Sequence, residues 1–385
     1  MTAALKALEA NRDQMLRWFE HMHRNPELSM QEEQTAQYIA DIVSEWGYDV
    51  ETGVGKHGIV ASMTVGDSDK AIGIRADFDA LPIQEENTLP YQSQVEGVAH
   101  LCGHDGHTTM LLAAGKYLAE TKNFNGTVRL IFQPGEETME GGPAMISDGL
   151  FERFPVDAVF AMHNMPGLEL GKFYFTPGQM MSAVDNWEIE LTGKGAHGAM
   201  PELSIDPVVA GSSLVMALQT IISRNVSPQH QAVVTVGAFQ PGEAGNVVAQ
   251  SAILRLSIRT TTPEDREMVL DKVRTLTRTQ AEGYGCSYEI REGMPGAVLV
   301  NDPDETHRAY EIARDAFGED DAVYPGPTFL ASEDFAFMLQ KKKGTYCFIG
   351  NGDTPMVHHP QFTLNPDILP RGAAFWVALT EGYLR

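Results

Sequence analysis

The densest group of potential metal ligands in the chain is the segment Cys102-Gly103-His104-Asp105-Gly106-His107. Thiolate and imidazole are preferred ligands of zinc-like metals, and one glycine between Cys102 and His104 allows both side chains to face one centre. A small buried cysteine beside a helix-capping Asp105 or Thr108 would produce the same sequence pattern. Taken alone, the segment leaves a metal site and a structural role both open.

Glu136 and Glu137 follow a Pro-Gly turn, which itself follows the apolar run Val128–Phe132. Adjacent carboxylates in a loop point in different directions, so one can bind a metal while its neighbour handles a proton. Metal hydrolases need both roles, because a carboxylate must take a proton from the activated water and pass it to the leaving amine. A solvated acidic loop is the structural alternative.

Short apolar runs bounded by Gly, Asp and Pro predict strands that are buried on both faces of a sheet. Helical stretches such as Thr108–Leu118 separate several of them, which predicts an α/β sheet that is at least partly parallel. The runs are Gly58–Thr64, Ala71–Arg75, Val128–Phe132, Ala158–Met162 and Tyr346–Ile349.

Polar side chains follow three of these predicted strands. Asp77 and Asp79 follow the second run, Glu136 and Glu137 the third, and His163 the fourth. Ligands of α/β sheets bind beyond the carboxyl ends of the strands, so we expect these side chains to converge on one crevice.

The middle of the chain, residues 183–296, has a different pattern. Its predicted order of elements is β-α-β-β-α-β, which is that of a small ferredoxin-like α+β unit. The elements are a strand at Trp187–Leu191, a helix at Asp206–Arg224, strands at Ala232–Phe239 and Ile253–Thr260, a helix at Pro263–Glu282 and a strand at Ser287–Arg291. Residues 1–182 and 297–385 then form one discontinuous domain, as expected for a chain of 385 residues that is too long for a single core.

The formal net charge of −24 makes phosphate backbones and anionic lipid surfaces unfavourable partners, so we expect neither nucleic acid nor membrane binding. No segment approaches the ~20 consecutive apolar residues of a membrane span, and the N-terminus lacks the apolar core of a signal peptide. Three cysteines are too few for a disulfide framework, which favours a reducing, cytoplasmic compartment.

Other histidines are ambiguous when they are read singly. His163 ends an apolar run, where a hydrogen-bonded core histidine is common, and the His358-His359-Pro360 stretch is equally open. His197 lies in the glycine-rich stretch 193–201, but no Gly-Lys-Ser/Thr or G-x-G-x-x-G pattern supports a phosphate-binding loop there. A nucleophilic Cys102 paired with a histidine is another alternative. It leaves the glutamates and remaining histidines without roles, so a metal site is preferred.

All these motifs, in this order, resemble the M20 metallopeptidase family, in the amidohydrolase branch that contains hippurate hydrolase, N-acyl-amino-acid aminoacylases and auxin-conjugate hydrolases. The resemblance covers nearly the whole chain, with departures at Gly135, where Ala is common, and Thr138, where Gly is common. The segments that carry it are His23–Ser29 with Glu32–Ala36, Arg75–Ile83, Cys102–His107, Gln133–Glu137, Gly193–His197, Ser332–Phe335 and Val357–Pro360.

The resemblance implies a zinc-peptidase-like catalytic domain with a mixed sheet flanked by helices, and a smaller lid that carries a dimer interface. It implies two divalent ions per subunit (Mn, Zn, Co or Ni), with Cys102 in the place of a bridging aspartate. The implied ligands are Cys102, His104, Glu137, His163 and His358. Glu136 matches the general base, and His197 the lid histidine that steadies the oxyanion, often in the partner's active site. Asn246 and Arg259 match lid residues that hold the substrate carboxylate or carbonyl.

We therefore expect a metal-dependent amidohydrolase that cleaves N-acyl amino acids, hippurate-like or N-acetyl, into a carboxylic acid and a free amino acid. A dipeptidase or an N-carbamoyl-amino-acid hydrolase needs the same machinery with a different pocket. A non-catalytic small-molecule-binding protein is the alternative from another class. The presence of Glu136 together with all five candidate ligands argues against it.

Overall fold

The computed structural model describes residues 2–385 and divides into two compact units. The first unit is formed by the chain up to Met180, by Val300–Thr328 and by Asp334–Arg385. The second unit is formed by Met181–Leu299 and Phe329–Glu333. The short segment Phe329–Glu333 lies within the range 297–385 that we expected to belong wholly to the catalytic domain.

An eight-stranded mixed sheet forms the centre of the first unit, in the order β1-β2-β4-β3-β5-β16-β6-β15. Its central strands β4, β3, β5 and β16 run parallel, whereas β1 and β2 pair antiparallel with their neighbours. Strand β6 pairs antiparallel with β16 and parallel with β15. The predicted α/β class with a partly parallel sheet is confirmed. The strands are β1 (Asp49–Val54), β2 (Gly58–Val65), β3 (Ala71–Asp77), β4 (Gly126–Gln133), β5 (Ala158–Pro166), β6 (Phe173–Phe175), β15 (Ala322–Val323) and β16 (Gly344–Gly352).

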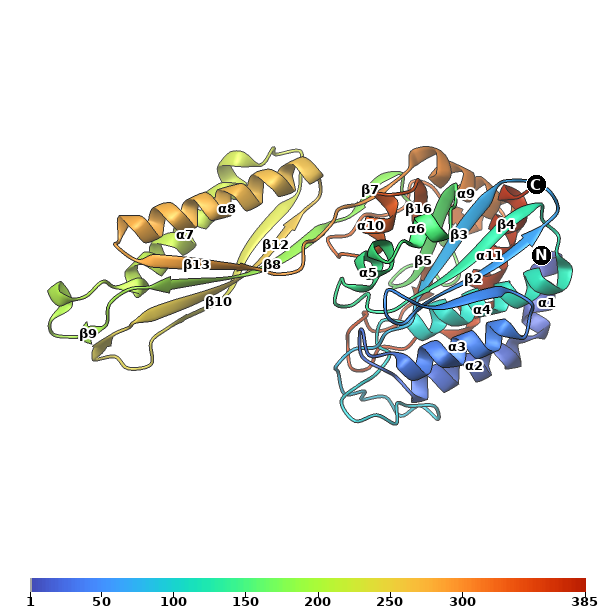
Figure 1. Cartoon of the computed structure of the whole chain (residues 1–385), viewed down its shortest axis with the longest axis horizontal. Coiled ribbons are helices and arrows are strands. Elements are labelled where there is room, and N and C mark those ends of the chain that lie inside the picture. Colours follow the sequence, from blue (N-terminus) through green and yellow to red (C-terminus); the bar gives the residue numbers. More distant parts are fainter. Residues whose placement is uncertain (1) are drawn as a thin grey trace. The chain divides into compact units, whose positions relative to one another are not determined.

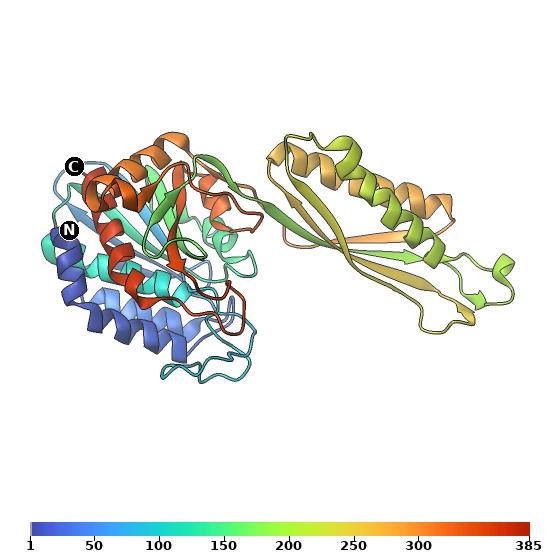
Figure 2. The ribbon, with the colours of Figure 1, turned by 180° about the vertical axis from the view of Figure 1, so that it is seen from behind.

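Helices cover both faces of this sheet, because every residue of β3 and β5 is buried and needs apolar neighbours on each side. Figures 1 and 2, seen from opposite sides, show α5 and α10 on one face and α4 and α11 on the other. The helices of this unit are α1 (Ala3–Ala10), α2 (Arg12–Arg24), α3 (Glu33–Ser44), α4 (His104–Thr121), α5 (Gly141–Ser147), α6 (Leu150–Arg153), α9 (Pro303–Phe317), α10 (Phe335–Leu339) and α11 (Leu369–Tyr383).

Helix α4 begins at His104, four residues before the predicted start near Thr108. The expectation rested on apolar periodicity, which is absent from the segment before Thr108. Gly103 has a φ of +100°, a left-handed conformation that glycine adopts at no steric cost, and it turns the chain directly into the helix. The potential ligands His104 and His107 therefore lie on the first turn of a buried helix.

The second unit is the predicted β-α-β-β-α-β arrangement, with an antiparallel sheet in the order β10-β12-β8-β13 covered by α7 and α8 (Figure 1). Asp206 and Thr262 cap the two helices through their side chains, and a proline follows each cap. Two further two-stranded sheets pair β9 with β11 and β7 with β14. The elements of the second unit are β8 (Ala183–Thr192), β9 (Ala196–His197), α7 (Pro207–Asn225), β10 (Ala232–Pro241), β11 (Val247–Val248), β12 (Ser251–Thr260), α8 (Pro263–Gly283) and β13 (Ser287–Glu292). Strands β7 (Gly178–Met181) and β14 (Leu299–Asn301) lie where the chain passes from one unit to the other.

Helix α7 is, among residues 2–385, the one helix long and apolar enough to cross a membrane by length and composition. It comes closer to that limit than we expected from the sequence. Its side chains Leu214, Leu218 and Ile221 are buried in the core of the second unit. This is the ordinary position of an apolar helix in a globular domain.

Candidate metal centre

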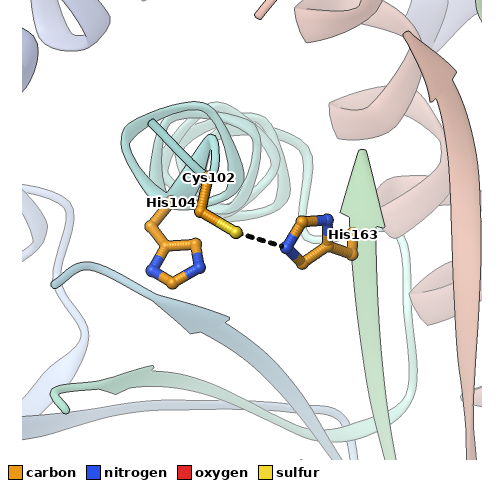
Figure 3. A group of neighbouring side chains, drawn as sticks. All are labelled: Cys102, His104 and His163. Atoms are coloured by element: carbon orange, nitrogen blue, oxygen red, sulfur yellow. Dashed lines mark hydrogen bonds between the residues drawn. The ribbon is translucent and has the colours of Figure 1, made fainter. Parts of the chain in front are cut away.

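Side chains from α4, β5 and two loops meet at the carboxyl end of the central strands. Cys102 lies in the bend just before α4, His104 is the first residue of α4 and His163 comes from β5, as Figure 3 shows. The Cys102 Sγ lies 3.3 Å from the His163 Nε2. The loop after β4 adds Glu136 and Glu137 to the same place. The convergence predicted from the strand ends is thus present.

Two groups of donor atoms, each with all its atoms within 4.8 Å of one another, share Cys102. One consists of Cys102, His104 and His163, and the other of Cys102, Glu137 and His358. A third group joins His104 to both glutamates. The first unit therefore brings all five expected ligands together, with the thiol common to two sets.

Neighbouring groups fix the direction in which the ligand histidines point. The Nδ1 of His163 donates to the carbonyl oxygen of Asn164 at 2.5 Å, which leaves its Nε2 free to face Cys102. The Nδ1 of His104 donates to the Asp79 carboxylate at 3.0 Å. Hydrogen bonds of this kind set the tautomer of a metal-binding histidine and orient its ring.

The donor atoms left over fit divalent metal ions. The Nε2 of His104 and the Oε1 of Glu137 are both buried without a hydrogen-bond partner. Buried polar atoms are nearly always hydrogen-bonded, so these two atoms, in one thiol–imidazole–carboxylate cluster, are suitable ligands for a divalent cation. Because the two atoms belong to residues of the ligand set and not to bystanders, the residues present match the implied metals.

His358 and not its neighbour His359 faces this cluster. The His358 Nε2 lies 3.3 Å from the Glu137 Oε1, and the residue has a positive φ of +68°. The exposed His359 instead accepts a bond from the backbone N–H of Gln361. The geometry favours His358 as the ligand, whereas the sequence pattern alone does not distinguish His358 from His359.

Buried charge dominates the electrostatics of the cluster. Burial alone would lower the pKa of His104, but the carboxylates of Asp77 and Asp79 outweigh it and raise that pKa to about 10. Burial, together with Glu137 and Glu136, raises the pKa of the Cys102 thiol well above its ordinary value. A bound divalent cation would reverse both shifts, since it stabilises the thiolate and the neutral imidazole.

A second layer of residues behind the cluster was only partly foreseen. His107 donates through Nδ1 to Asp77 at 2.6 Å, and Asp77 also pairs with the buried guanidinium of Arg75 at 2.6 Å. The same guanidinium bonds Asp334 at 2.9 Å and Gln133 at 2.9 Å. The alternation Arg75-x-Asp77-x-Asp79 at a strand end was the available signal, but it does not reveal which partner each side chain takes.

We expect Arg75→Met to lower the free energy of unfolding by roughly 3–5 kcal/mol, because it leaves Asp77 and Asp334 buried without their cation. The loss would be measured by urea unfolding. Arg12→Met is the matched control, since the Arg12–Asp367 pair is exposed and contributes about 1 kcal/mol or less. Equal stability of the two variants would contradict a supporting role for Arg75.

The remaining candidate site residues lie in the second unit. His197 on β9 is opposite Val247 on β11, and the N–H of Gly198 donates to the carbonyl of Asn246 at 2.8 Å, so His197 and Asn246 are neighbours. His197 is exposed, and its Nδ1 accepts from the N–H of Ala199 at 3.1 Å. In the neutral ring the proton is therefore on Nε2, which leaves a donor available to a ligand.

Arg259 is not brought together with His197 and Asn246. It pairs with Val184 near the start of β8, and its guanidinium donates to the carbonyl of Leu330. The β8–β12 ladder runs eight further residue pairs to Thr192, beyond which β9 lies at the far end of this unit (Figure 1). At ~3.3 Å per residue, Arg259 and His197 are separated by about 25 Å or more.

Comparison with known proteins gives consistent matches along the chain. The model of peptidase family M20/M25/M40 matches residues 73–382. A hippurate hydrolase from Campylobacter jejuni is 43% identical over 364 residues, which cover 94% of this chain and 95% of that protein. An N-acetyl-L-cysteine deacetylase from Bacillus subtilis is 35% identical, covering 92% of this chain and 84% of that protein.

Solved structures agree with the sequence matches. A dinuclear metal-binding peptidase of the M20 family from Bacillus subtilis superimposes with a TM-score of 0.83 at 30% identity, covering 97% of this chain and 98% of that chain. The matching family model, the identity to both relatives and the shared two-unit fold all point the same way. The chain belongs to peptidase family M20/M25/M40 and is a hydrolase of amide bonds.

Proposed function

We propose that this protein hydrolyses the amide bond of N-acyl amino acids, hippurate-like or N-acetyl, to a carboxylic acid and a free amino acid. The observation that carries the proposal is the cluster of five donors beside Glu136, with unpaired atoms on His104 and Glu137. The similarity to a hippurate hydrolase and to an N-acetyl-L-cysteine deacetylase supports this substrate class.

We assign the five donors to two divalent ions, which these residues would hold when the ions are bound. Mixed thiolate, imidazole and carboxylate donors suit manganese, zinc, cobalt or nickel. Such ions, when bound, polarise the scissile carbonyl and make a water acidic enough to attack at neutral pH. The ligands are Cys102, His104, Glu137, His163 and His358.

We assign the proton transfers to Glu136. Its Oε2 lies 4.0 Å from the unpaired Nε2 of His104, so the carboxylate faces the donor cluster and not the solvent. In this position it takes a proton from the attacking water and delivers it to the leaving nitrogen, which could not depart as an amide anion. Glu137, the adjacent residue, serves as a ligand, because it shares with Cys102 and His358 a donor group that does not include Glu136.

Residues of the second unit complete the site in this proposal. His197 presents its Nε2–H to the oxyanion that forms as the amide carbon is attacked, a contribution of ~3–4 kcal/mol per donor in a closed site. Asn246 and Arg259 hold the carboxylate or carbonyl of the substrate. The second unit then acts as a lid, and turnover depends on its closure.

The separation of Arg259 from His197 supports a homodimer. Both are fixed on one hydrogen-bonded sheet, about 25 Å or more apart, which far exceeds the length of an N-acyl amino acid. One lid cannot place both on the same substrate. We propose that Arg259 acts in its own subunit and His197 in the partner's site, within a dimer or a higher homo-oligomer that the lids hold together. We also propose a cytoplasmic setting, because all three cysteines are free.

Removal of the metals should lower activity by at least about 100-fold, because without them no carbonyl is polarised and no water is activated. Elemental analysis of the purified protein should give two divalent ions per subunit. Activity should return on addition of Mn²⁺, Zn²⁺, Co²⁺ or Ni²⁺, and chelator premixed with excess metal is the control. Full activity in chelator would contradict the metal assignment.

The substrate class is tested with each reloaded form on hippurate, N-acetyl amino acids, N-carbamoyl amino acids and dipeptides. Hydrolysis of the first two groups at the highest kcat/KM is the expected result. A preference for dipeptides or for N-carbamoyl compounds would instead make the protein a dipeptidase or an N-carbamoyl-amino-acid hydrolase with the same catalytic residues. Tight metal binding with no hydrolysis of any amide would favour a binding protein.

A further inference from the structure

A buried carboxylate outside the ligand set lies against the loop that carries Glu136. Glu32 immediately precedes α3 and is completely buried. Its Oε1 accepts the N–H of Gly135 at 2.8 Å and the N–H of Met30 at 2.9 Å. Its Oε2 is buried without a hydrogen-bond partner. Glu32 thus connects the turn before α3 to the residue directly before Glu136.

A second carboxylate holds the other side of the same loop. The N–H of Glu137 donates to the Oδ2 of Asp79 at 3.0 Å, and that oxygen also accepts the hydroxyl of Ser29 at 2.7 Å. The backbone N–H groups immediately before and after Glu136 are therefore both bound by buried carboxylates. Ser29 and Glu32, which support the two bonds, belong to one short turn.

The two turns are shaped to fit each other. Met30 has a φ of +61°, an uncommon conformation for a residue with a side chain. Gly135 has the same φ of +61°, and a Cβ there would lie 2.5 Å from the Met30 sulfur. The left-handed backbone and this close approach explain why glycine stands where alanine is common in the family. Strained backbone that surrounding contacts hold in place is typical of residues that position a functional group.

The two backbone hydrogen bonds that Glu32 accepts require the burial of a carboxylate, which is unfavourable. Burial, together with the nearby charge of Asp79, raises the pKa of Glu32 to about 7. A buried carboxyl with one oxygen that no protein donor binds destabilises the fold. A contribution to the site rather than to stability accounts for its presence.

We propose that Glu32 is a positioning residue, which holds the carboxylate of Glu136 in place through the N–H of Gly135. The proposal rests on the assignment of Glu136 as the general base. The proposal depends on the length of the side chain, which must bring an oxygen to the N–H of Gly135, and not on its charge. Glutamine at position 32 keeps an acceptor oxygen at the same distance along the side chain, whereas aspartate keeps the charge and is one methylene too short.

The test compares Glu32→Gln, Glu32→Asp and the matched control Glu27→Asp. Glu27 lies in the same segment, and its carboxylate bonds Thr35 and Gln34 at the start of α3, not the 135–137 loop. The quantities measured are kcat and KM for hippurate, or for whichever amide of the panel the wild type hydrolyses best. Metal content and Tm are measured on the same samples.

We expect Glu32→Asp to lower kcat by about 30–100-fold with KM within about twofold, because a shift of ~1 Å in a reacting group has effects of this size. Glu32→Gln and Glu27→Asp should retain the wild-type kcat, and all variants should keep two metals. Wild-type kcat in Glu32→Asp would overturn the proposal. So would loss of metal together with activity, or an equal loss of kcat in Glu32→Gln. Wild-type hydrolysis of the panel decides the proposed function separately.

Discussion

Glu136→Gln should lower kcat for N-acyl amino acid hydrolysis by about 1,000-fold, while the fold and both metals are retained. The amide has the volume of the carboxylate but cannot take a proton from water or return one to the leaving nitrogen. Glu136 shares one donor group with His104 and Glu137, but the five assigned ligands are complete without it, because neither donor group that contains Cys102 includes Glu136. Metal binding and catalysis should therefore separate in this variant.

The measurement is kcat/KM on hippurate with elemental analysis and a thermal melt of the same preparation. Glu140→Gln is the matched control, since Glu140 lies in the same loop and its carboxylate accepts only the hydroxyl of Thr138. The control should keep full activity. Near-native turnover in Glu136→Gln would rule out Glu136 as the base. Loss of metal along with turnover would make it a ligand instead.

The sequence predicted β2, β3, β4, β5 and β16 of the first unit, but not β1, β6 or β15, together with the crevice at the strand ends, because local patterns determine them. The run Ala71–Arg75 is apolar apart from Arg75, so it predicts a strand covered on both faces, and β3 is buried along its whole length. Parallel neighbours then bring their following loops to one edge. Glu136, Glu137 and His163 needed no further information to be placed together, whereas Cys102 and His104 joined them through the family resemblance.

The supporting residues could not be predicted in this way, because their partners are far away in the sequence. Arg75 and Asp334 are 259 positions apart, and Glu32 and Gly135 are 103 apart. The helical or strand periodicity of a sequence does not predict contacts between residues so far apart in the chain. In the sequence, Glu32 is one of two adjacent glutamates before a helix. Nothing there distinguishes it from a solvent-exposed glutamate at a helix N-terminus. The resemblance implied His358 as the ligand, and its 3.3 Å approach to Glu137 supports that choice over His359.

The candidate site residues of the second unit could not be placed from the sequence for a different reason. The resemblance implies that His197, Asn246 and Arg259 all contact substrate, and nothing in the sequence separates them. The register of β8 with β12 separates Arg259 from the other two residues. It places Arg259 beside Val184, at the end of the ladder that is opposite β9. A shared role on one small substrate then requires two subunits. This consequence can be tested without any structure of the dimer.

Mixing two inactive variants should restore activity. His197→Ala and Arg259→Gln, each as a pure protein, should lower kcat/KM by about 100-fold through loss of the oxyanion donor or of the substrate anchor. In a mixed dimer, the subunit with His197→Ala keeps its own Arg259 and receives an intact His197 from its partner. That one site of the two is complete, and the other lacks both residues.

Unfolding and refolding equal amounts of the two variants together should recover about a quarter of the wild-type activity, since random pairing makes half of the dimers mixed and each has one complete site of two. The measurement is kcat/KM on hippurate before and after mixing, with each variant refolded alone as the control. If both residues act in the same subunit, every site in the mixture lacks one of them and no activity returns. Recovery would thus assign His197 and Arg259 to different subunits, as the distance along the lid sheet demands.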